Sequence, residues 1–77
     1  MERIRGPVRG YFLASYACRV GELGQEFVGY TKLCSTRPRS FWDATGTITY
    51  GDARFHSAPD AMDNSEEIAL SSIEHSR

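Results

Sequence analysis

The fold is decided by the stretch Tyr11-Phe12-Leu13-Ala14-Ser15-Tyr16-Ala17-Cys18-Arg19-Val20, in which every even position is apolar or aromatic. Its odd positions mix apolar Leu13 with polar Ser15 and charged Arg19. Successive side chains of a strand point to opposite faces, so a period of two predicts a β-strand with one buried face. The neighbouring segments are therefore interpreted by how they can pair with this strand.

The next segment predicts an antiparallel partner for this strand. Residues 21–25 form a glycine-containing turn, and Glu26–Cys34 is rich in β-forming residues. A loop of this length joins antiparallel neighbours. Two registers are open, with either Tyr30 or Thr31 opposite Tyr16. We favour Tyr30, because paired aromatic side chains stabilise adjacent strands.

The N-terminal residues and the middle of the chain are less regular. We expect residues 1–8 to form a flexible arm, in which Gly6-Pro7 blocks any helix, and residues 9–76 to form a single α+β domain. After a polar, proline-containing loop, a third strand is expected over residues 47–55.

Strict alternation puts Ile48 and Tyr50 on the opposite side of this third strand from Phe55. A β-bulge at residues 51–52 would return all three to one face. The alternative is a tight turn at residues 51–52, which would split the segment into two short strands.

The residues after Phe55 predict one helix. Ser57 is a suitable N-cap, and Pro59 and Asp60 suit the first turn and the positive end of the helix dipole. Small and apolar residues then recur at helical spacing, at Ala61, Met62, Ser65, Ile68, Ala69, Ser72 and Ile73. The acidic residues Asp63, Glu66, Glu67 and Glu74 fall largely on the other side, and we expect the adjacent pair Glu66 and Glu67 to be solvated. A second capping signal at residues 64–67 would break the helix, but one continuous helix is favoured.

Together these elements predict an α+β fold in β-β-β-α order. The sheet is antiparallel with three strands, or four if residues 51–52 form a turn, and one C-terminal helix packs on one face. We expect the helix to lie near Phe12, Tyr16, Ile48 and Phe55. The second sheet face would then have no helix to cover it.

The stretch Phe55-His56-Ser57-Ala58-Pro59-Asp60-Ala61 resembles a motif of small uncharacterised bacterial proteins. In those proteins a strand ending in Phe is followed by a Ser or Thr cap, and then by an acid and Ala in the first helical turn. The preceding hairpin is similar as well. This resemblance implies the β-β-β-α fold and no activity. The double-stranded-RNA-binding domain shares that order, but it needs a preceding helix and a basic start to its last helix, which this chain lacks.

Composition and cysteine placement limit the class of protein. A chain of 77 residues with 40% hydrophobic and 25% charged residues is globular but has a thin core. No stretch reaches the ~20 apolar residues of a membrane span, and the first residues lack the apolar core of a signal peptide. We therefore expect a cytoplasmic protein without membrane contact. Cys18 and Cys34 fall far apart along the hairpin, so both are expected to be reduced.

Charge is distributed unevenly along the chain. Residues 1–42 carry seven basic and three acidic side chains, whereas residues 43–77 carry two basic and seven acidic ones. This pattern predicts a polarised surface. It would also suit head-to-tail self-association.

The residues that could carry chemistry do not form a recognised pattern. Cys18, Cys34, His56 and His75 lack the spacing of a metal site. Cys34 precedes an arginine-containing loop that could lower its thiol pKa, but a small hydrophobic role at a strand end is favoured. No phosphate-binding glycine loop or nucleophile motif is present. We therefore expect no catalytic, cofactor or metal site, and a protein that is not an enzyme.

Binding is the expected function, with a protein partner or a second copy of the chain as a homodimer. The residue types enriched at interfaces point to a surface made by Tyr11, Leu13, Arg19, Arg37, Arg39, Phe41 and Trp42. We expect Leu13 and Trp42 to be exposed there. The alternative is single-stranded nucleic-acid binding through the aromatic and arginine side chains of residues 9–42. A net charge of −1 and an isoelectric point near 6.1 speak against that alternative.

Overall fold

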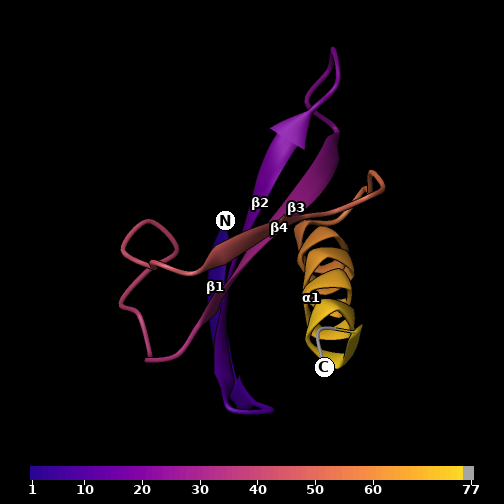
Figure 1. The fold of residues 1–77 in the computed structure, drawn as a ribbon. Helices are drawn as coiled ribbons and strands as arrows, with labels where there is room; N and C mark the ends of the chain where they lie inside the picture. Colours follow the sequence, from indigo (N-terminus) through magenta and orange to yellow (C-terminus); the bar gives the residue numbers. More distant parts are fainter. Residues whose placement is uncertain (76–77) are drawn as a thin grey trace.

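The computed structural model describes residues 1–75, in which one helix packs against one side of a twisted sheet (Figure 1). The elements are β1 (Glu2–Val8), β2 (Tyr11–Val20), β3 (Glu26–Cys34), β4 (Thr47–Tyr50) and α1 (Ala58–His75). All neighbouring strands are antiparallel, in the order β1-β2-β3-β4. The α+β class and the sheet followed by a C-terminal helix are confirmed, and the sheet has four strands.

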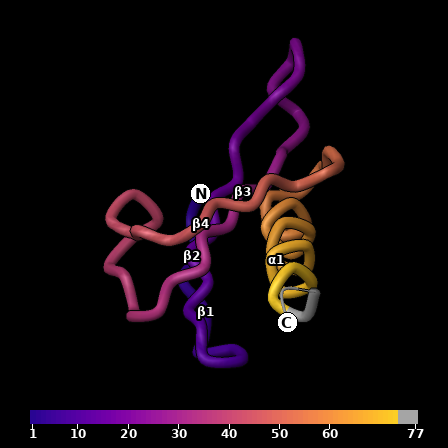
Figure 2. Tube along the Cα trace, in the orientation of Figure 1, coloured from indigo at the N-terminus to yellow at the C-terminus, as the bar shows by residue number. Residues whose placement is uncertain are grey.

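The central hairpin of β2 and β3 follows the prediction. Both strands have the expected bounds, and Tyr16 pairs with Tyr30. The hairpin tip extends beyond the helix (Figure 2). Cys18 pairs with Val28 near the tip, whereas Cys34 lies towards the open end, and both cysteines are free.

The fourth strand of the sheet is β1, where we expected a flexible arm. Arg3 lies opposite Ser15 and Arg5 lies opposite Leu13, and the register shifts between Arg5 and Val8, around the Gly6-Pro7 pair. The expectation was wrong because β1 has no run of alternating apolar residues. Contacts of its arginines with the distant helix anchor it instead, and local sequence carries no sign of them.

The third predicted strand is shorter than expected. β4 ends at Tyr50, and the chain leaves the ladder before Phe55 rejoins it through a single bridge to Phe27. This excursion is longer than a bulge and is not the tight turn of the alternative. As a result Phe55 lies on the helix side, whereas Ile48 and Tyr50 face away from the helix.

The helix lies on the face opposite to the predicted one. It covers Leu13, Ser15 and Ala17, the odd positions of β2, and its Ala61 and Met62 form a cluster with Ala17. Of the residues expected beneath it, Phe55 alone packs there, while Phe12 and Tyr16 join the cluster on the other face. The prediction placed the larger apolar residues beneath the helix, but the side with small residues allows the closer approach.

The predicted helix start and continuity are confirmed. The backbone amide of Asp60 donates to Ser57 Oγ at 3.3 Å, as a capping serine does, and α1 continues without a break to His75. The second capping signal does not end the helix, because Asn64 uses its side chain elsewhere. The side-chain nitrogen of Asn64 donates to the Asp52 carboxylate, and its side-chain oxygen accepts from the Asp52 backbone amide. These two bonds fix the excursion before Phe55.

Gly29 is the position at which β3 and α1 come closest. A Cβ at this residue would collide with the Ala61 carbonyl and lie 2.8 Å from Ser65 Oγ. The helix therefore rests against bare backbone here, and any side chain would push the two layers apart.

We predict that Gly29→Ala lowers the free energy of unfolding by about 2–3 kcal/mol, because the added methyl group overpacks this contact. Urea denaturation followed by circular dichroism measures the change. Leu23→Ala is the control, since Leu23 is 80% exposed at the hairpin tip and should change stability little. Equal stability of Gly29→Ala and the wild type would contradict this close packing.

Candidate functional site

The helix side of the sheet contains a buried carboxylate. Glu66 of α1 is 3% exposed and accepts hydrogen bonds from Arg3 Nε at 3.1 Å and from Arg5 Nη1 at 2.8 Å. Arg3 Nη2 donates to the same carboxylate at 2.9 Å and to Asp63 at 2.6 Å. Burial acts to lower the pKa of Arg3, but hydrogen bonds to Asp63 and Glu66 outweigh it and raise the pKa. Arg3 therefore stays charged.

A chain of hydroxyl groups continues from this carboxylate across the sheet. Ser15 Oγ donates to Glu66 at 2.6 Å and lies 3.0 Å from Thr31 Oγ1, which lies 2.7 Å from Ser65 Oγ. Ser65 in turn donates to the Met62 carbonyl. Within residues 1–73 every buried polar side-chain atom that the structure describes has a hydrogen-bond partner. No polar side-chain atom of this network is therefore left without a partner, and the network holds α1 against the sheet.

This network corrects two expectations. Glu66 was expected to be solvated and is buried, whereas Glu67 is exposed as predicted. The uneven charge of the chain also finds its explanation inside one molecule, because the basic strand β1 binds the acidic side of α1. Charge complementarity therefore does not require a second copy arranged head to tail.

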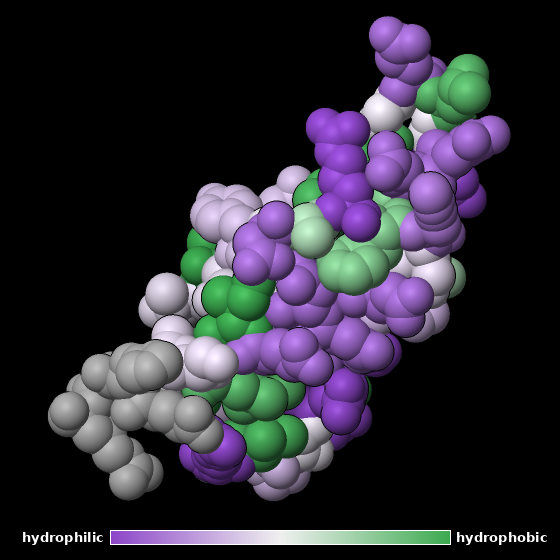
Figure 3. Space-filling model, turned by 90° about the vertical axis from the view of Figure 1, so that its right-hand side faces the viewer, coloured by the Kyte–Doolittle hydropathy of each residue, from purple (hydrophilic) through white to green (hydrophobic). Residues whose placement is uncertain are grey.

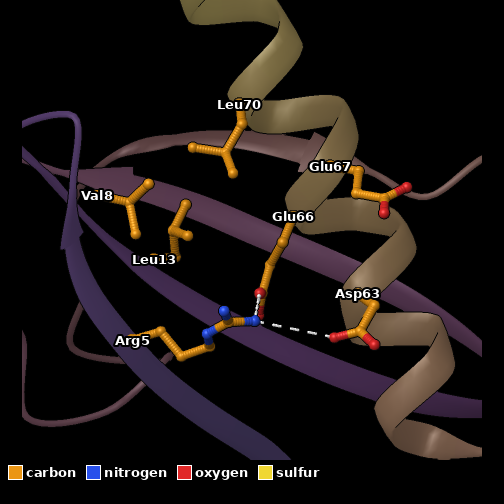
Figure 4. Close-up of a pocket in the computed structure, with 7 residues that line it drawn as sticks. All are labelled: Arg5, Val8, Leu13, Asp63, Glu66, Glu67 and Leu70. Atoms are coloured by element: carbon orange, nitrogen blue, oxygen red, sulfur yellow. Dashed lines mark hydrogen bonds and ion pairs between the residues drawn. The ribbon is translucent and has the colours of Figure 1, made fainter.

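A cleft of about 330 Å³ lies beside Glu66, between α1 and the β1–β2 hairpin (Figure 4). Val8, Leu13 and Leu70 form its apolar part. Its arginine, Arg5, lies 2.8 Å from Glu66 and 3.9 Å from Asp63, so the basic group of the cleft is already paired within the chain. The helix side as a whole has a broad hydrophilic surface broken by separate apolar patches (Figure 3). We therefore assign this cleft a structural role.

The other sheet face bears a depression of about 250 Å³, here named the aromatic groove. Apolar atoms line it. Its residues are Tyr16, Cys18, Tyr30, Phe41, Trp42, Ile48 and Tyr50. They come from β2, β3, β4 and the segment 35–46, which lies across the sheet from α1 (Figure 1).

Ring contacts hold the groove in shape. Phe41 is 4% exposed and packs 5.5 Å from the Tyr16 ring, while Trp42 lies edge-on to Tyr16 at 5.0 Å. Tyr30 and Tyr50 form a second edge-on pair at 5.5 Å. Pairs of this geometry contribute about 0.5–1.5 kcal/mol beyond burial, so the groove is largely preformed.

Lys32 fixes the segment that carries Phe41. Its ammonium group donates to the carbonyls of Phe41 at 3.0 Å and Ala44 at 3.3 Å, and lies 4.3 Å from the Phe41 ring centre. Phe41 and Ala44 pack against Ala14 and Cys34 on the sheet. Segment 35–46 is thus fixed to the sheet at Phe41 and Ala44. Trp42 nevertheless remains 69% exposed and Tyr50 62% exposed.

The predicted interaction surface is divided between the two faces. Phe41 and Trp42 line the groove, and Trp42 is exposed as expected. The prediction that Leu13 is exposed is wrong, because Leu13 is 1% exposed and lies beneath the helix. Arg19 lies on the helix-side face too, over the Phe27 ring, and donates to the Gly24 carbonyl.

The other three predicted residues are exposed but lie outside the groove. They are Tyr11, Arg37 and Arg39, of which Arg37 lies over the Phe12 ring at 5.9 Å. The predicted interaction surface did not include the other groove residues, which are Tyr16, Cys18, Tyr30, Ile48 and Tyr50. The alternation of apolar residues at even positions was the sequence signal for this face. It shows which side chains share a face, but it does not show which face the helix covers.

The thiol of Cys34 does not have the environment of an activated nucleophile. It is 6% exposed, and burial raises its pKa although the charge of Lys32 acts to lower it. A raised pKa keeps the thiol protonated at neutral pH, so Cys34 acts as a small hydrophobic residue in this cluster.

Metal ligands and membrane spans are the remaining features of interest. Among the described residues, no group of three or more His, Cys, Asp or Glu side chains is placed to hold a metal ion. The His75 side chain lies outside the described part of the chain. None of the helices described has the length and apolar character needed to cross a membrane.

Comparison with known proteins adds no relative. No protein family, curated protein or solved structure matches this chain. The resemblance of residues 55–61 to small bacterial proteins therefore stays a prediction.

We predict that Glu66→Ala lowers the free energy of unfolding by about 2–4 kcal/mol, because it leaves Arg3, Arg5 and Ser15 without their shared acceptor. Glu67→Ala is the matched control: it removes a neighbouring but exposed acid and should change stability by less than about 0.5 kcal/mol. Thermal and urea unfolding compare the variants. Similar losses in both would show that the buried network does not hold the helix.

Proposed function

We propose that this chain is a non-enzymatic protein-interaction module, which docks an extended segment of a partner protein at the aromatic groove and the adjoining edge of β4. The observation that carries the proposal is the exposure of Trp42, Tyr50 and Ile48 side by side in a groove with apolar walls. Aromatic anchors in a preformed apolar depression are typical of interface hot spots. A cytoplasmic location is part of this proposal.

The backbone of β4 supports docking of a strand. The Gly51 amide donates to the Gly29 carbonyl at 2.8 Å, which makes Gly29 and Gly51 a hydrogen-bonded pair of the antiparallel ladder. Such pairs alternate, so Thr49 also points its backbone groups toward β3. The amides and carbonyls of Ile48 and Tyr50 then point outward, where an added strand can bind them.

The two edges of the sheet differ in their protection. β1 carries Glu2, Arg3, Arg5 and Pro7, the charged and proline residues that discourage edge pairing. β4 reads Thr-Ile-Thr-Tyr and carries no charge. Within the described residues β4 pairs only with β3, so its outer side is the edge open to a partner.

Single-stranded nucleic acid is the second candidate, favoured by the exposed rings of Trp42 and Tyr50. Backbone phosphates need cationic partners near those rings. Lys32 lies beside Phe41 of the groove, and two backbone carbonyls already bind its ammonium group. Arg37 is on the same sheet face, but it lies over the Phe12 ring, outside the groove. Arg19 lies on the other face. These placements favour a peptide over a phosphodiester chain.

A displayed library of random peptides, selected on the immobilised protein, tests the proposal. We expect selected peptides to shift the emission of Trp42 to shorter wavelength, because docking removes the indole from water. Tyr50→Ala should weaken their binding at least about tenfold, since aromatic anchors carry most of the energy at such sites. Leu23→Ala removes an even more exposed apolar side chain outside the groove and should leave the affinity unchanged.

Titration of the same indole with single-stranded oligonucleotides completes the test. Strong quenching with a steep salt dependence, together with no selection of groove-binding peptides, would overturn the proposal in favour of nucleic-acid binding.

A further inference from the structure

We infer that the partner strand is β4 of a second copy of this chain, paired antiparallel about a two-fold axis through Thr49. This inference rests on the proposed function and names its partner. The resulting sheet would continue from one copy into the other, with both helices on one face and both aromatic grooves on the other.

The first support is that the open edge is self-complementary. The outward-pointing backbone groups belong to Ile48 and Tyr50, which are separated by one residue. A two-fold axis through Thr49 places Ile48 of one copy opposite Tyr50 of the second copy, and the reverse. Each such pair can exchange both amide–carbonyl hydrogen bonds, so the free groups of both residues are satisfied together.

The second support is the match of side chains. Residues opposite each other in an antiparallel pair share a face, so Ile48 would pack beside Tyr50 of the second copy. Both residues line the aromatic groove, and the two grooves would join into one apolar strip. The four residues of β4 carry no charge, so no like charges face each other across this axis.

The area that would be covered sets the strength of the contact. An aromatic side chain buries about 150–250 Å², so Tyr50, which is 62% exposed, offers on the order of 100 Å² per copy. Ile48 and the strand backbone add to this. A standard interface takes about 800 Å² per partner, which places this contact among small and reversible interfaces.

The unlike edges determine how the assembly ends. Because the charged, proline-containing β1 discourages further pairing, growth stops once the two β4 edges have met. A two-fold contact that uses each open edge once closes as a dimer and does not extend into a fibre.

Cysteine cross-linking tests the register directly. Thr49 would face Thr49 of the second copy as a non-hydrogen-bonded pair, whose Cα atoms lie about 4.5 Å apart, within disulfide range. In a Cys18→Ser background, Thr49→Cys should form covalent dimers under mild oxidation. Thr47→Cys is the matched control, because its counterpart in the second copy would lie about 13 Å away and should not cross-link.

Sedimentation velocity of the unmodified chain from about 1 µM to 1 mM tests association itself. The wild type should shift from monomer to dimer, Ile48→Lys should stay monomeric, and Leu23→Lys should behave as the wild type. Circular dichroism confirms that each variant is folded. A wild type that stays monomeric throughout, or equal cross-linking of Thr47→Cys and Thr49→Cys, overturns the inference. If selected peptides still bind the groove in that case, the self-pairing fails while the interaction module stands; if they do not, both fail.

Discussion

The contact of Glu66 with Arg3, Arg5 and Ser15 decides which face of the sheet the helix covers. A carboxylate that is 3% exposed must have its hydrogen-bond partners nearby, and only one sheet face supplies two arginines and a line of hydroxyl groups. Once the helix is bound there, Gly29 and the neighbouring small residues allow it to rest almost on the strand backbone. The position of the aromatic groove follows, because Tyr16, Tyr30 and Tyr50 then remain on the face that the helix does not use.

The parts of the fold that depend on local sequence were predictable. The period of two in Tyr11–Val20 identified β2, the aromatic pair Tyr16 and Tyr30 identified the register, and Ser57 identified the start of the helix. Each of these signals lies within one element or between two adjacent ones. They are also the places where hydrophobic pattern and capping chemistry agree.

The parts that depend on distant contacts were not predictable in this way. β1 pairs as a strand because its arginines meet Asp63 and Glu66, which are about sixty residues later in the chain. Alternation reveals that β2 has two different faces, but it does not say that a helix prefers the one with Ser15 and Ala17. The smaller part of the candidate site was therefore predicted: Phe41 and Trp42 were identified, whereas Leu13 proved buried and the tyrosines of the groove were not named.

The exposed aromatic residues follow from this arrangement of the core. The helix covers the face with the small and hydroxyl side chains, where Phe27 and Phe55 also pack, whereas Tyr16, Tyr30 and Tyr50 lie on the second face. The second face must therefore be covered by something else, and segment 35–46 covers part of it with Phe41 and Ala44. That segment leaves Ile48 and Tyr50 exposed, and they lie at the outer edge of β4, which pairs with no further strand among the described residues. In a domain with so thin a core, apolar side chains next to free backbone groups gain most from a partner that supplies a strand, because one contact then buries the rings and satisfies the edge.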